Sequence, residues 1–152
     1  MIDLSDYESG QKYDGDYDND LKALQDRLAE LQSLHILHEA RTLIVVEGWD
    51  AAGKGGAIKR LTATLDPRYY QVYPISAPSP EEKDKHFLWR FWNKLPGSQE
   101  IHIWDRSHYG RVLVERVEGF CSEAEWRRGY DEINECESRQ GEIGTKIIKL
   151  FL

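Results

Sequence analysis

The chain begins with a polar segment and then changes to a regular hydrophobic pattern. Residues 1–18 are rich in Asp, Tyr, Gly and Ser and show no sustained apolar period, so we predict a flexible lead-in. Beyond it, five leucines recur at alternating spacings of three and four residues: Leu21, Leu24, Leu28, Leu31 and Leu34. This spacing predicts a single apolar stripe on a helix of about twenty residues. We therefore place the folded domain at residues 19–152.

Short apolar runs farther along the chain predict strands at 42–48, 71–75, 101–105 and 145–152. The first, TLIVVEG, is continuous and β-branched, as expected of a strand buried on both faces of a parallel sheet; we expect the last strand to be buried as well. Helical patterns separate the runs, at 57–65, from Ser79 to Pro96, through Val112 to Val117, and from Ser122 onward. Two of these helices begin with a Ser-x-x-Glu capping box. Alternating strands and helices predict a three-layer α/β fold with a mostly parallel sheet.

Composition narrows the class of protein. The chain has 152 residues, 40% hydrophobic and 31% charged, which predicts one soluble domain, and its acidic opening lacks the features of a signal peptide. We expect a cytoplasmic protein without a membrane partner. The formal charge of -7 argues against broad nucleic-acid binding. Neither Cys121 and Cys136 nor the histidines have the spacing of a His/Cys metal site, so any metal should be a hard cation held by oxygen.

The segment Gly48–Lys54 matches the pattern G-x-x-x-x-G-K between a predicted strand and a predicted helix. In such a P-loop, or Walker A motif, backbone N–H groups surround a phosphate at a helix N-terminus and the lysine reaches the outer phosphates. Besides Lys54, the residues expected to bind phosphate are Gly48, Ala51, Ala52, Gly53, Gly55 and Gly56. The alternative is a glycine-rich helix start with a solvated lysine. Gly55 stands where most P-loops have a Ser or Thr that binds Mg²⁺, so another oxygen ligand is needed.

Two aspartates are the candidate metal ligands. Asp50 lies inside the loop, where a carboxylate beside bound phosphates would be repelled unless a cation lay between them; alternatively it only caps the loop. Asp105 closes the strand IHIWD, the Walker B arrangement that holds Mg²⁺ beside a P-loop. Arg106 follows and could neutralise charge on a transferred phosphoryl group. A surface ion pair is the alternative for Asp105 and Arg106. We predict Asp50, Lys54, Asp105 and Arg106 as catalytic residues.

Arg111, Glu115 and Arg116 follow on the next helical stretch. We predict that they contact phosphate or nucleotide, although Arg111 and Glu115 are also spaced for an ordinary salt bridge within a helix. The aromatic residues Trp89, Phe91, Trp92 and Trp104 could form a base-stacking platform. Their positions on an apolar helix face and in a buried strand favour core packing instead.

The segments EGWDAAGKGGAIKRL (47–61) and WDRSHYGRVLVERVEGF (104–120) together resemble the type 2 polyphosphate kinase family, the polyphosphate:nucleotide phosphotransferases. The resemblance extends from the leucine helix to the final strand and includes LWRFWNKLPG (88–97). Trp49, His108 and Gly110 make it closest to members that use nucleoside monophosphates such as AMP.

This resemblance implies a thymidylate-kinase-like P-loop NTPase fold that transfers a phosphoryl group between polyphosphate and a nucleoside mono- or diphosphate with Mg²⁺. It implies that Lys54 holds phosphate, that Asp50 and Asp105 hold the metal and the acceptor phosphate, and that Arg106 holds the transferring group. Arg111, Glu115 and Arg116 would belong to a region that closes over the substrates. Family members continue past a strand such as 145–152 into a basic lid segment, so we expect a C-terminally shortened chain. We also expect a homo-oligomer.

The sequence leaves two alternative functions open. An ATP-dependent nucleoside or nucleotide kinase would also pair a P-loop with an Asp-Arg motif. A shortened P-loop module could bind phosphate without catalysis, because phosphoryl transfer depends on positioning and on neutralising charge.

Overall fold

The computed structural model describes residues 13–152, in which helices and strands alternate along most of the chain. In chain order the elements are α1 (Tyr17–Leu37), β1 (Arg41–Glu47), α2 (Lys54–Thr62), β2 (Tyr70–Pro74), α3 (Pro80–Lys83), α4 (Trp89–Trp92), β3 (Ile101–Asp105), the 3-10 helix η2 (His108–Arg111), α5 (Val114–Val117), α6 (Glu123–Glu142) and β4 (Thr145–Phe151). Residues 1–12 of the predicted flexible segment 1–18 lie outside the described residues, and α1 begins within that segment. No helix within 13–152 has the length and apolar character needed to cross a membrane.

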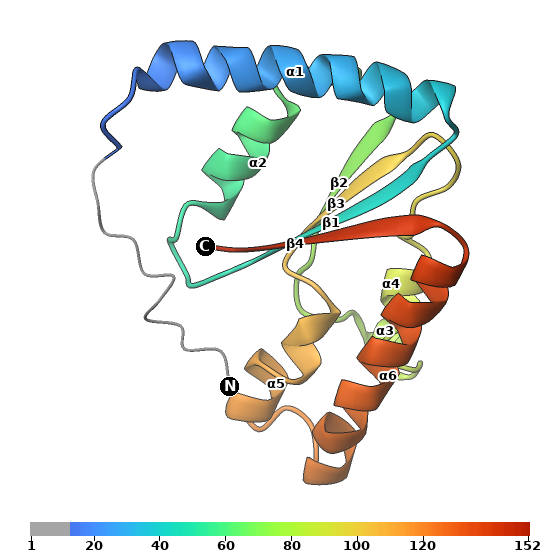
Figure 1. The fold of residues 1–152 in the computed structure, drawn as a ribbon. Helices are drawn as coiled ribbons and strands as arrows, with labels where there is room; N and C mark the ends of the chain where they lie inside the picture. Colours follow the sequence, from blue (N-terminus) through green and yellow to red (C-terminus); the bar gives the residue numbers. More distant parts are fainter. Residues whose placement is uncertain (1–12) are drawn as a thin grey trace.

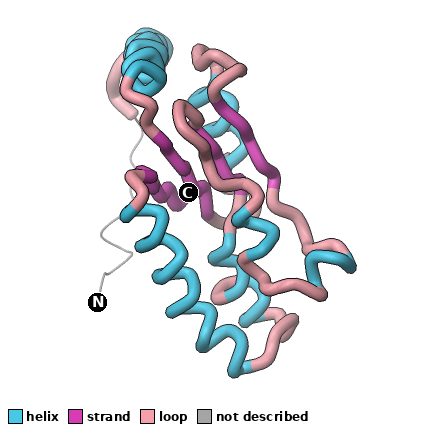
Figure 2. The backbone as a smooth tube through the Cα atoms, turned by 90° about the vertical axis from the view of Figure 1, so that its right-hand side faces the viewer, coloured by secondary structure: helices cyan, strands magenta, loops and turns pink. Residues whose placement is uncertain are grey.

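The strands form a single sheet in the order β2-β3-β1-β4, and every neighbouring pair is parallel. Helices α1 and α2 lie on one side of this sheet, and α3 to α6 lie on the other (Figure 1). The view turned by 90°, in which α1 is seen nearly along its axis, again places helices on both sides of the strands (Figure 2). The predicted three-layer α/β fold is confirmed.

The two faces of β1 pack against different helical layers. Leu43 and Val45 belong to a core with Trp104 and with buried residues of α4 and α6. Ile44 and Val46 belong to a second core with Ile58 of α2 and residues of β3. Because successive side chains of a strand point to opposite faces, a strand covered on both sides needs an uninterrupted apolar run. The predicted burial of this strand on both faces is confirmed.

Helix α1 forms as predicted, but only part of the predicted apolar stripe is covered by the rest of the protein. Leu24, Leu31 and Leu34 are 64%, 45% and 48% exposed, whereas Gln32 is buried at 4%. The Gln32 amide donates to the carbonyl of Asp66 at 3.2 Å and accepts from the N–H of Asp66 at 2.7 Å. Polar bonds to the loop after α2 thus accompany this rotation of α1, in which Leu21 and Leu28 of the predicted stripe are half-buried.

The predicted helix from Ser79 to Pro96 is divided into α3 and α4. The capping box of Ser79 and Glu82 starts α3 as predicted, but the helix stops at Lys83. The His86 ring then accepts a hydrogen bond from the N–H of Leu88 at 3.3 Å, and such local side-chain bonds compete with helix continuation. In α4, Phe91 is buried as expected, but Trp92 is 46% exposed, which corrects its predicted place in the core.

Two further expectations are corrected in the second half of the chain. The predicted helix through 112–117 is reduced to the short elements η2 and α5, and Leu113 and Val117 remain exposed. Strand β4 pairs with β1 in the predicted range but lies at the sheet edge and is exposed along most of its length. Helix α6 starts at the predicted Ser122–Glu125 capping box and buries Ile133.

Candidate functional site

The loop between β1 and α2 has the backbone of an anion-binding turn. Gly53 is the N-cap of α2 with a φ of 94°, and no side chain caps this helix. Ala51 also has a positive φ, of 59°. The first N–H groups of a helix have no acceptor inside the helix, and the helix dipole adds partial positive charge there. The start of α2 is therefore prepared for a negatively charged ligand.

A cavity of about 420 Å³ lies at this loop. Its lining residues are Asp50, Ala51, Ala52, Gly53, Lys54, Gly55, Pro74, Ile75, Asp105 and Arg106. They come from the loop, the start of α2 and the carboxyl ends of β2 and β3. Ligands of open parallel sheets bind at this edge. The structure thus brings together the predicted catalytic set, Asp50, Lys54, Asp105 and Arg106, in one cavity.

Lys54 is held inside the curve of the loop. The residue is only 8% exposed, and its ammonium donates to the carbonyl oxygens of Gly48 at 3.0 Å and Trp49 at 2.6 Å. An ammonium has three N–H donors, so one remains for a ligand. A lysine fixed in this way stabilises the loop and supplies positive charge at the cavity wall.

Asp105 and Arg106 are fixed by backbone bonds to both neighbouring strands. The Asp105 carbonyl accepts from the N–H of Ile75 at 2.9 Å, and the Arg106 N–H donates to the Val46 carbonyl at 2.9 Å. Arg106 has a φ of 67°, a left-handed conformation that is uncommon for a residue with a side chain. This turn ends β3 and leaves the Arg106 side chain at the cavity.

Arg106 faces Asp50 across the cavity. Its Nη2 lies 3.6 Å from Asp50 Oδ1, and the side chains are 55% and 98% exposed. Exposed ion pairs of this kind contribute at most about 1 kcal/mol. The pair can therefore open at little cost when a ligand with its own charges enters.

Some residues near the site were not predicted from the sequence. Pro74 and Ile75 line the cavity because β2 ends beside β3. The predicted strand 71–75 already indicated that a strand ends at these residues. Ser107 is 3% exposed and donates to Glu47 Oε1 at 2.5 Å. This bond joins the ends of β1 and β3, and nothing in the local sequence indicates it.

Two predicted phosphate-binding glycines are not among the lining residues. Gly48 lies at the start of the loop against the backbone of Leu152, and its carbonyl is one of the acceptors for Lys54. Gly56 lies inside α2, where its carbonyl accepts from Arg60 at 3.0 Å. Both contribute to the loop and helix that form the cavity rather than to its surface.

The structure does not bring Arg111, Glu115 and Arg116 to the cavity. Arg111 pairs with Glu115 at 3.1 Å, which is the ordinary salt bridge considered from the sequence, and its guanidinium lies 4.6 Å from the centre of the Phe87 ring. Arg116 donates to the Tyr130 hydroxyl at 2.9 Å. Their contact with a nucleotide stays a prediction.

Comparison with known proteins places this geometry in context. The family model described as Polyphosphate kinase 2 (PPK2) matches residues 11–152. The chain is 48% identical over 150 residues to a polyphosphate:AMP phosphotransferase of Pseudomonas aeruginosa, a match that covers 98% of this chain and 30% of that protein. It is 41% identical over 138 residues to ADP-polyphosphate phosphotransferase 3 of Rhizobium meliloti, covering 91% of this chain and 49% of that protein.

A solved structure is similar to this chain in fold as well. The crystal structure of Polyphosphate Kinase 2 from Arthrobacter aurescens TC1 superimposes with a TM-score of 0.89 at 35% identity, covering 99% of this chain and 55% of that chain. The present chain therefore spans from under a third to about half of the length of these proteins.

Proposed function

Because this chain belongs to the polyphosphate kinase 2 family, we propose that it transfers a phosphoryl group between inorganic polyphosphate and a nucleotide. The observation that carries this proposal is the cavity in which Asp50, Lys54, Asp105 and Arg106 converge. Phosphoryl transfer needs in-line positioning and neutralisation of negative charge. The cavity offers a helix N-terminus, an ammonium, a guanidinium and two carboxylates for these tasks.

In the proposed reaction an oxygen of the nucleotide's terminal phosphate attacks the terminal phosphorus of polyphosphate. The bond from that phosphorus to the bridging oxygen breaks, and the shortened polyphosphate keeps that oxygen. The amides at Gly53 and the Lys54 ammonium would hold the phosphates, since both line the cavity. Arg106 would leave Asp50 and stabilise the charge on the transferred group.

The donor set also fits a hard divalent cation, which we propose to be Mg²⁺. Asp50 and Asp105 are the carboxylates that line the cavity, and within residues 13–152 no cluster of three or more His, Cys, Asp and Glu side chains could hold a metal. Mg²⁺ typically binds through one or two carboxylates plus substrate phosphates and waters. When bound by Asp50 and Asp105, it would neutralise charge on the phosphates.

We further propose a nucleoside monophosphate, AMP, as the acceptor. The Pseudomonas aeruginosa relative at 48% identity is named a polyphosphate:AMP phosphotransferase, and the Rhizobium meliloti relative named for ADP is 41% identical. The higher identity to the AMP protein supports AMP over ADP as the acceptor.

The test is to incubate the chain with polyphosphate, Mg²⁺ and either AMP or ADP, and to follow ADP and ATP formation. Lys54→Ala and Asp105→Asn should each abolish transfer, by removing a phosphate cation and a metal ligand. Matched controls are Lys59→Ala, at an exposed position of the same helix α2, and Asp131→Asn, at an exposed position of α6. Both controls should keep wild-type rates.

Other results would contradict the proposal in distinct ways. Transfer from ATP to a nucleoside, with polyphosphate ignored, would identify a nucleoside kinase. Equilibrium binding of tripolyphosphate or nucleotide without any turnover would identify a binding module. Wild-type rates from Lys54→Ala or Asp105→Asn would reject the roles given to those residues.

A further inference from the structure

A partly buried polar cluster joins α6, η2 and β4 beside the Asp105–Arg106 turn. Its centre is Glu137 of α6, whose side chain is 14% exposed. Glu137 Oε1 accepts a hydrogen bond from the Tyr109 hydroxyl at 2.6 Å and lies 3.4 Å from Nε2 of His108. Glu137 Oε2 accepts from the Lys149 ammonium at 2.5 Å. One carboxylate thus binds both first residues of η2 and the neighbouring strand β4.

The donors around Glu137 keep it negatively charged. Burial by itself would raise the pKa of this carboxyl, but hydrogen bonds from His108, Lys149 and Tyr109 lower the pKa to about 2. Burial opposes the charge of Lys149 as well, but its bonds to Glu137 and Tyr109 raise its pKa. The His108 side chain is only 2% exposed, so removing Glu137 would leave it buried without its charged partner, which is costly. The cluster therefore fixes η2 firmly against α6.

The anchoring of η2 matters for Arg106, which lies two residues before it. The backbone of Arg106 would not keep its left-handed conformation without support from its surroundings. A non-glycine residue at a φ of 67° carries a strain of about 1–3 kcal/mol, which persists only when the surroundings enforce it. On the amino side, the turn is enforced by β3 and by the bond from Arg106 N–H to Val46. On the carboxyl side, it is enforced by the Ser107–Glu47 bond and by Glu137.

We propose that Glu137, which does not line the cavity, is a positioning residue for Arg106. By holding His108 and Tyr109, it keeps the turn at Arg106 in place and the guanidinium over the cavity. Helix α6 thereby becomes part of the machinery for phosphoryl transfer, although none of its residues lines the cavity. This inference rests on the proposed function for its kinetic consequence, but the anchoring itself is testable without activity.

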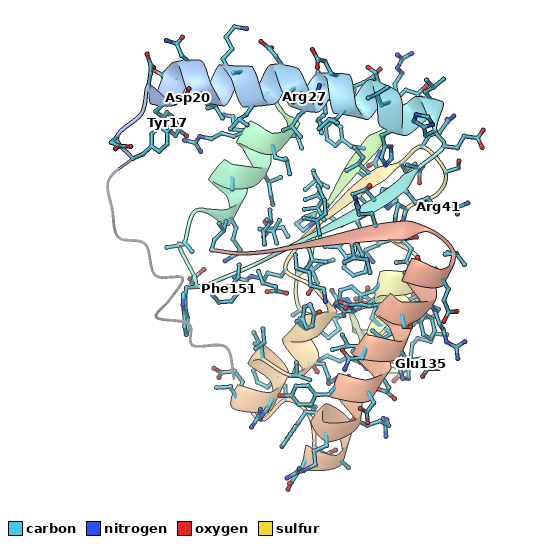
Figure 3. All side chains as sticks on the ribbon, in the orientation of Figure 1. Tyr17, Asp20, Arg27, Arg41, Glu135 and Phe151 are labelled. Atoms are coloured by element: carbon cyan, nitrogen blue, oxygen red, sulfur yellow. The ribbon has the colours of Figure 1, made fainter. Side chains whose placement is uncertain are left out.

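The matched control for Glu137 is Glu135 on the same helix. Glu135 lies on the side of α6 away from α5 (Figure 3), is 62% exposed and pairs with Arg139. We expect Glu137→Gln to lower kcat by about 10- to 100-fold, the loss typical of a misplaced catalytic group. Glu135→Gln should change kcat by less than about twofold.

A double-mutant cycle separates positioning of Arg106 from general loss of structure. Residues that act as one unit are not additive, so in an Arg106→Lys background the change Glu137→Gln should cost less than about twofold. An equal loss in both backgrounds would show a general structural role and overturn the proposal. If Glu137→Gln does not fold, Tyr109→Phe removes one bond to Glu137 and should give a smaller loss with the same dependence on Arg106.

Hydrogen exchange of residues 106–111 without substrate provides a readout independent of turnover. Exchange should be faster in Glu137→Gln than in wild type and unchanged in Glu135→Gln, because Glu137 contacts η2 whereas Glu135 pairs with Arg139. Unchanged exchange in Glu137→Gln would overturn the anchor. Faster exchange in a protein whose wild type shows no transfer would support the anchor and reject the proposed function.

Discussion

The carbonyl oxygen of Leu152 lies so close to Gly48 that a Cβ at position 48 would be 2.1 Å from it. The N–H of Leu152 donates to Glu47 at 3.0 Å, and the N–H of Trp49 donates to Leu152 at 3.2 Å. The end of β4 therefore continues its pairing into the start of the loop between β1 and α2 (Figures 1 and 3). Gly48 also has a φ of 145°, so both the contact and the backbone require glycine.

We expect Gly48→Ala to lower the free energy of unfolding by about 1–3 kcal/mol, through backbone strain and the forced displacement of Leu152. It should also weaken tripolyphosphate binding, because the loop must shift. The control is Gly141→Ala in α6, where a Cβ would meet nothing within 4 Å; there alanine should raise stability by up to about 1 kcal/mol. Urea denaturation measures the free energy of unfolding of both variants. Equal changes in Gly48→Ala and Gly141→Ala would contradict the role of Leu152.

The central part of the candidate site could be predicted from the sequence because each residue is tied to a local pattern. Lys54 follows a glycine loop, and Asp105 and Arg106 follow an apolar strand. Parallel strands bring these ends together. The places of Arg111 and Glu137 depended instead on contacts with partners such as Phe87 and Lys149, which no local pattern encodes.

The same reason explains why the rotation of α1 could not be predicted. Leucine spacing predicted a helix correctly, but it could not show which side of the helix meets the sheet. That choice follows from Gln32, whose amide bonds to Asp66 across a separation of 34 residues. A buried polar group must be satisfied, so the hydrogen bonds of Gln32 outweighed burial of Leu31.

Substitutions at neighbouring positions of α1 should show this directly. Gln32→Ala should cost about 1–3 kcal/mol of stability, since it leaves the N–H and carbonyl of Asp66 without their partner. Leu31→Ala should change stability by less than about 0.5 kcal/mol, since the side chain is 45% exposed. Thermal and urea unfolding of both variants provide the measurement. The reverse order of costs would show that Leu31, and not Gln32, holds α1 in place.

The strained turn at Arg106 gives a prediction about two replacements of the same residue. Arg106→Ala and Arg106→Gly should both abolish phosphoryl transfer, because each removes the guanidinium. Arg106→Gly should nevertheless be more stable than Arg106→Ala by about 1 kcal/mol, because only glycine adopts a φ of 67° without strain.

The control for this comparison is the exposed helical position Lys59. There the order should reverse, since alanine stabilises a helix relative to glycine by about 1 kcal/mol. Chemical denaturation of the alanine and glycine variants at both positions measures the order of their stabilities. The same order at both positions would show that the backbone at Arg106 is not strained.

Acid stability should report on the Glu137 cluster. The folded protein lowers the pKa of Glu137 from 4.5 to about 2, so the folded state takes up this proton less readily than the unfolded state. The stability that the carboxylate contributes is therefore fully present above pH 4.5 and is lost as the pH falls toward 2.

Wild type and Glu137→Gln should consequently differ most in stability above about pH 5, and the difference should shrink on acidification by an amount on the order of 3 kcal/mol. The glutamine cannot ionise, so its bonds to Tyr109 and its contact with Lys149 do not change over this range. Urea unfolding at a series of pH values from neutral to acidic measures the difference. A difference that stays constant with pH would mean that the carboxylate is not held in its charged form by His108, Tyr109 and Lys149.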